Sequence, residues 1–106
     1  MTWMILVMAG LLEVAWAWSM KLSAGFTKPL PTILTLVLMA ASFGLLSLSM
    51  RSLPLGTAYT IWTGIGAIGA FIVGVVALGE QLSALRIAAA LLIVAGLVLM
   101  KLATPS

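Results

Sequence analysis

Few side chains in this sequence can do chemistry. The 106 residues include no cysteine and no histidine, and the only acidic residues are Glu13 and Glu80. Without cysteine and histidine, the chain has no thiolate or imidazole to bind a metal or attack a substrate, and it forms no disulfide. We therefore expect no metal, no cofactor and no enzymatic activity. Any proton transfer near neutral pH must use one of the two carboxyl groups.

Glu13 lies inside a long apolar run at the start of the chain. A charge in the middle of a membrane helix costs about 2.5–3.5 kcal/mol on insertion scales, so such residues usually have a function. The alternative is a protonated glutamic acid that hydrogen-bonds to a neighbouring helix. Glu80 stands beside Gln81 and Ser83, where a solvated charge or a helix cap is the expected role.

The neighbours of Glu13 on a helix are mostly small. Residues three and four positions away share its face, and these are Ala9, Gly10, Trp16 and Ala17. One face therefore carries a carboxylate, one indole and little else. This pattern leaves room for a small guest beside an acid.

Ser42, Tyr59 and Trp62 lie in two other apolar runs at a similar depth. At about 1.5 Å per residue, Glu13 lies roughly 15 Å in from the N-terminal side and the other three roughly 7–12 Å. Each has an ordinary alternative, because Tyr59 and Trp62 fit an interfacial belt or core packing and Ser42 fits a bond to its own helix. Their common depth favours one site shared with Glu13.

Such a site would bind a cation. An ionised carboxylate attracts cations, and so do indole and phenol rings. A planar guanidinium pairs with a carboxylate through two parallel hydrogen bonds. Because proton and cation would compete for the same acid, one site is sufficient for antiport.

The elements that position these residues are predicted to be four membrane-spanning helices. The chain is 64% hydrophobic and 7% charged, whereas soluble domains are about 45–50% apolar and about 25% charged. Apolar runs of about 20 residues cross a bilayer, and they occur at residues 3–20, 30–50, 55–78 and 82–100. We expect an all-α integral membrane protein with a single domain over residues 1–106. The net charge of +3 is scattered at helix ends and forms no patch for nucleic acid.

Charge and small residues both bear on assembly. One side of the membrane carries two basic residues, Arg51 and Lys101, and the other carries three, so the charge rule gives almost no orientation. Either other signals place the chain or it inserts both ways. Small residues such as Ala89 and Gly96 mark helix contacts, within one chain or between chains. We expect an oligomer, because four helices enclose little space.

The whole chain resembles the small multidrug resistance family. The resemblance rests on the length, the four spans, Glu13 in the first span, and two motifs: Lys21-x-Ser23-x-Gly25-Phe26-Thr27 and Pro54-x-Gly56-x-Ala58-Tyr59-x-Ile61-Trp62-x-Gly64-x-Gly66. It implies a proton-coupled exporter of the bacterial plasma (inner) membrane, working as an antiparallel dimer of identical chains. It also implies that Glu13 binds both proton and substrate.

Within this family the chain is similar to the guanidinium exporter branch, on the basis of Trp16, Met39, Ser42 and Lys101. Gly44 departs from the bulkier residue expected there, which bears on the tolerance of bulky substrates. The resemblance implies three groups of residues beside Glu13. They are the substrate-site and Glu-orienting residues Trp16, Ser42, Tyr59 and Trp62, the helix bend at Gly64 and Gly66, and the dimer-packing residues Ala89 and Gly96.

The expected function is export of guanidinium in exchange for protons. The first alternative is a broad exporter of quaternary ammonium and other hydrophobic cations on the same scaffold. The second is a subunit that transports nothing, such as a rotor proteolipid or a partner of another membrane protein. A rotor subunit normally has two helices with its acid in the second, so the four spans and Glu13 in the first argue against it.

Overall fold

Four long helices make up the computed structural model, in which residues 1–104 are described. They are α1 (Thr2–Leu22), α2 (Pro29–Ser49), α3 (Leu55–Ala77) and α4 (Ala84–Ala103). Each is long and apolar enough to cross a membrane. The prediction of an all-α chain with four membrane-spanning helices is confirmed, although α4 begins at Ala84, after the expected position 82.

Short connections separate the helices, and local chemistry explains where they occur. Ser23 ends α1, where its hydroxyl donates to Met20 O (2.6 Å) and accepts from Phe26 N (3.0 Å). Pro29 begins α2, at a helix position where the missing N–H costs nothing. Ser83 caps α4, because its hydroxyl accepts from Arg86 N at 3.2 Å. Ser83, and not Glu80, therefore supplies the helix cap that the sequence suggested for this segment.

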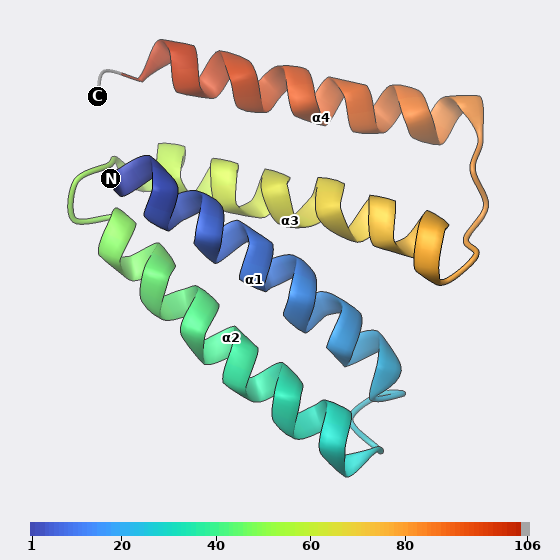
Figure 1. Ribbon diagram of the computed structural model, residues 1–106. Helices are drawn as coiled ribbons and strands as arrows, with labels where there is room; N and C mark the ends of the chain where they lie inside the picture. The colour runs from blue at the N-terminus through green and yellow to red at the C-terminus, as the bar shows by residue number, and fades with distance from the viewer. Residues whose placement is uncertain (105–106) are drawn as a thin grey trace.

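Three helices form the packed part of the molecule (Figure 1). α1 packs against both α2 and α3. Glycines allow the close approach of α1 and α3, since a Cβ at Gly10 would meet Ile65 and a Cβ at Gly69 would meet Val14. The buried apolar residues of these three helices and the α2–α3 turn are Leu6, Ala9, Leu46, Leu53, Ala58, Ile61 and Trp62.

The fourth helix contacts only α3 along its backbone (Figure 1). None of its 20 residues is buried. At the end of the molecule that carries the N-terminus, Thr104 Oγ1 lies 3.1 Å from Thr57 Oγ1 and Lys101 Nζ lies 4.4 Å from the centre of the Trp3 ring. Most of the α4 surface is therefore apolar and free of intramolecular partners.

Candidate functional site

Glu13 lies near the middle of α1, with its carboxyl group against α3. A Cβ added at Gly66 would collide with Oε1 and Cδ of Glu13, so the missing side chain at position 66 makes room for the carboxyl group. Glu13 Oε1 is buried, and none of the described residues 1–104 donates a hydrogen bond to it. The structure therefore presents a buried carboxyl oxygen that is available to a ligand or a proton.

The two glycines assigned to a bend both lie at helix contacts. Gly66 faces Glu13, and a Cβ at Gly64 would collide with Leu97 of α4. α3 is a continuous α-helix from Leu55 to Ala77. The bend thus stays a prediction, and the structure gives these glycines a different use, which is close approach.

Ser42 joins the three packed helices. Its hydroxyl on α2 donates to the carbonyl oxygen of Ala9 on α1 (2.7 Å) and accepts from Nε1 of Trp62 on α3 (3.0 Å). Ser42 is fully buried and Trp62 is 6% exposed. A bond from Ser42 to its own helix and an interfacial position for Trp62 are therefore wrong, whereas core packing of Trp62 agrees with the structure. The two side chains link the three helices about one helical turn from Glu13, since Ala9 precedes Glu13 by four residues.

Trp62, which makes this hydrogen bond, also contacts two other aromatic rings, and one of these contacts a fourth ring. The ring of Phe43 lies 6.2 Å from that of Trp16 and 5.7 Å from that of Trp62, and Tyr59 lies 5.6 Å from Trp62, measured between ring centres. Trp16 shares the Glu13 face of α1, and its Nε1 is buried with no acceptor among residues 1–104. Four rings thus follow one another across α1, α2 and α3.

Phe43 is the member of this cluster that the sequence did not reveal. It follows Ser42 in an apolar run of α2, where one more apolar side chain gives no signal. In the structure it bridges Trp16 and Trp62 although its side chain is 45% exposed. It thus forms the outer wall of the cluster.

Tyr59 lies at the boundary between the cluster and the outside of the chain. Its side chain is 53% exposed, and it lines an apolar groove of about 510 Å³ between α3 and α4 together with Gly96. Ala89 lines a neighbouring groove of about 240 Å³. The two residues expected at a dimer seam therefore face open grooves within the single chain.

Glu80 lies outside this cluster, in the α3–α4 connection. Its Oε1 lies 3.6 Å from Nη2 of Arg86, and both side chains are partly exposed. Arg86 also donates to the carbonyl oxygen of Gln81 and lies 5.1 Å from the centre of the Phe71 ring. Glu80 is therefore part of a surface ion pair. This agrees with the solvated charge that the sequence suggested for it.

The geometry suits the binding of a small cation. Glu13 brings a carboxyl oxygen, the aromatic cluster brings π faces that attract cations, and the Ser42–Trp62 hydrogen bond fixes the cluster. Within residues 1–104 there is no group of three or more carboxylate, imidazole or thiolate side chains that could hold a metal ion.

Comparison with known proteins agrees with this description. The sequence model of the family described as "Small Multidrug Resistance protein" matches residues 1–103. A protein of Yersinia pseudotuberculosis serotype I (strain IP32953) named "Guanidinium exporter" is 57% identical over 104 residues, which are 98% of this chain and 100% of the relative. Proteins of the same name from Escherichia coli (strain K12) and Citrobacter freundii are 51% identical, over 98% of this chain and 99% of each relative.

The match extends over nearly the whole chain, well beyond the residues around Glu13. The four helices that it covers are each long enough to cross a bilayer, which makes the chain a multi-pass protein of the bacterial inner membrane. By both sequence and architecture, the chain belongs to the small multidrug resistance family.

Proposed function

We propose that this protein exports guanidinium across the bacterial plasma membrane in exchange for protons. The observation that carries the proposal is the buried Oε1 of Glu13, to which no residue among 1–104 donates a hydrogen bond. Relatives that are 51–57% identical over nearly the full length bear the name guanidinium exporter. This name supports the choice of cation.

The exchange follows from competition for one acid. A bound proton neutralises Glu13 and removes the charge that attracts a cation, whereas guanidinium needs the ionised carboxylate for two parallel hydrogen bonds. Trp16 and Trp62 offer π faces to the cation, and Ser42 holds Trp62 in place. Binding of guanidinium therefore releases protons from the site, and protonation of the site releases guanidinium.

Two copies of the chain complete this proposal. Small residues line the open α3–α4 grooves, and α4 has no buried residue in a single chain. Two copies inserted in opposite orientations would enclose one site between two Glu13 side chains. Antiparallel copies act like the inverted repeats of larger transporters, so exchange of their two conformations alternates access between the two sides.

The test is proton movement in vesicles that contain only this protein. Guanidinium added on one side should drive protons toward the side of addition, and tetraalkylammonium ions should do so less well. Singly substituted guanidiniums are expected to pass as well, because nothing lies within 4 Å of a Cβ placed at Gly44. If tetraalkylammonium drives proton movement and guanidinium does not, the broad multidrug function replaces the proposed one. If no cation does, the chain is a subunit without transport of its own.

A further inference from the structure

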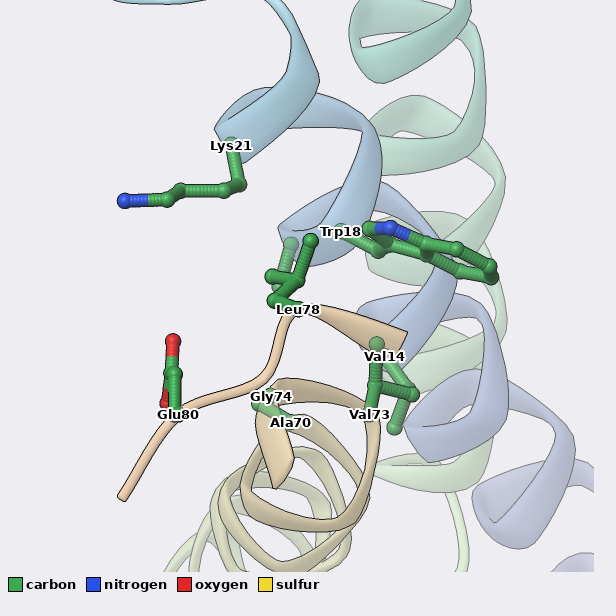
Figure 2. Close-up of a pocket in the computed structure, with 9 residues that line it drawn as sticks. Val14, Trp18, Lys21, Ala70, Val73, Gly74, Leu78 and Glu80 are labelled. Atoms are coloured by element: carbon green, nitrogen blue, oxygen red, sulfur yellow. The ribbon is translucent and has the colours of Figure 1, made fainter. Parts of the chain in front are cut away.

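A pocket lies between α1 and α3, on the side of the membrane opposite the N-terminus (Figure 2). Its volume is about 120 Å³, and its lining includes Ala17 and Lys21 of α1, Ala70 and Gly74 of α3, and Glu80 of the following loop. Several waters would fit in this volume. Figure 2 shows the charged ends of Lys21 and Glu80 extending toward the same open side of the pocket.

The inner end of the pocket lies close to Glu13, because Val14, the next residue of α1, lines it. Ala17 follows Glu13 by four residues on α1, and Ala70 follows Gly66 by four residues on α3. Residues four apart are neighbours on a helix surface, separated by about 6 Å along the axis. Because Gly66 contacts the Glu13 carboxyl group, the pocket lies between the buried acid and the membrane surface, although neither Glu13 nor Gly66 lines it.

Glu80 lies at the outer end of this pocket. A Cβ added at Gly74 would collide with its carboxyl group, just as a Cβ at Gly66 would collide with that of Glu13. Gly66 and Gly74 are about 12 Å apart along α3. Glu80 therefore lines the outer end of the pocket. Glu13, the only other acidic residue of the sequence, lies beyond the inner end and does not line it.

The outer carboxylate already holds a guanidinium group, the one of Arg86. This group lies 3.6 Å from Glu80 Oε1, donates to Gln81 O, and stands over the ring of Phe71. A carboxylate, a carbonyl oxygen and an aromatic face are the groups that a free guanidinium ion would also use. The surroundings of Glu80 thus have the chemistry of the proposed substrate site, at the surface.

We propose that Glu80 is a second cation-binding residue, which receives guanidinium at the mouth of the pocket and delivers it to Glu13. Lys21 at the same mouth repels the incoming cation, and Arg86 competes with it for Glu80. The inference rests on the proposed function and adds a route and an entry residue to it. The Glu80 carboxylate attracts cations and the two positive charges oppose it, so removal of each charge should change the rate at which guanidinium arrives.

The test compares arrival rate with equilibrium affinity. Purified full-length protein is mixed rapidly with guanidinium at low salt, and proton release is followed with a pH-sensitive dye. Glu80→Gln should slow the second-order rate about threefold or more, whereas Lys21→Gln and Arg86→Gln should raise it. The Kd for guanidinium, obtained from the amplitudes of proton release, should stay within about twofold of wild type, because Glu80 changes the route and not the final site. High salt should remove the differences in rate. Lys28→Gln is the matched control, since Lys28 is exposed before α2 and does not line the pocket.

The predicted rate changes have opposite signs, so the result can be interpreted even if one variant folds poorly. A damaged protein would not bind guanidinium faster than wild type. Slower release in Glu80→Gln with faster release in the Lys21 and Arg86 variants supports the inference. A wild-type rate in Glu80→Gln, an equal gain in Lys28→Gln, or a Kd that changes in step with the rate overturns it. If wild-type protein releases no proton with guanidinium, the proposed function fails and this inference fails with it. If wild-type protein releases protons with guanidinium and the Glu80, Lys21 and Arg86 variants do so at the same rate, this inference fails and the proposed function stands.

Discussion

Gly66 defines how closely the acid of the site approaches its neighbouring helix. Because the Glu13 carboxyl group occupies the space of a Cβ at position 66, Gly66→Ala should displace it and lower guanidinium affinity about tenfold, in line with the 1–3 kcal/mol that overpacking costs. Titration of guanidinium-induced proton release gives the affinity. Gly56→Ala is the control on the same helix, since nothing lies within 4 Å of its Cβ. Equal affinities in the two variants would contradict the contact.

Ser42 is the residue whose loss should be felt most in stability. Ser42→Ala leaves the buried indole N–H of Trp62 and the Ala9 carbonyl oxygen without their partner, and an unsatisfied buried group costs about 1–3 kcal/mol. The midpoint of thermal unfolding in detergent should fall, and the near-ultraviolet circular dichroism of the tryptophans should change. Ser49→Ala is the matched control, because Ser49 is equally buried on α2 but bonds to Leu46 O of its own helix. A smaller effect at Ser42 than at Ser49 would exclude a linking role.

Much of the candidate site could be predicted from the types of its residues and from their depths in the membrane. An acid in an apolar run indicates a function because burial of its charge is costly. The similar depths of Ser42, Tyr59 and Trp62 predicted that they share a site with this acid. What depth cannot give is the direction of each side chain around its helix axis. For that reason the Ser42–Trp62 hydrogen bond, the place of Phe43 between two indoles and the fit of Glu13 against Gly66 became visible only in the structure.

Among the helices, α4 is the one without a packing partner on most of its surface. Its residues were predicted to pack against another chain, and the structure places Ala89 and Gly96 in open grooves beside α3. Gly96→Leu should fill its groove and shift the protein from dimer toward monomer, as measured by light scattering in a mild detergent. Ala88→Leu is the control, because Ala88 lies on α4 and lines neither groove. A Gly96→Leu protein as dimeric as the control would exclude this face of α4 as the seam.

The helix ranges followed from apolar length and the turn residues, because a membrane span must contain about 20 apolar residues. The start of α4 differs because Glu80–Ser83 form the ion pair and the cap before the helix begins. The close contact of α1 with α3 was not predictable from periodicity. It depends on which glycines face a neighbour, and the sequence contains ten glycines.

For the molecule as a whole, the near balance of basic residues predicts insertion in both orientations. Ser106→Cys gives the chain a single cysteine, since the natural sequence has none; residue 106 lies outside the described part of the structure. An impermeant thiol reagent applied to intact cells should label part of the protein, and a permeant reagent should label the rest. Labelling entirely from one side would exclude the antiparallel dimer.

The most direct test of the whole account is proton release from Glu13 when guanidinium binds. Glu13→Gln keeps the shape and removes the charge, and it should fold as a dimer because a neutral amide is cheaper to bury than a carboxylate. It should release no proton with guanidinium. Glu13→Asp should still bind, with an altered pH profile. In wild-type protein guanidinium affinity should fall as the pH drops through the pKa of Glu13, because proton and cation need the same oxygens. Coupled exchange that survives in Glu13→Gln would contradict the account, because the only other acid of the chain, Glu80, lies at the surface.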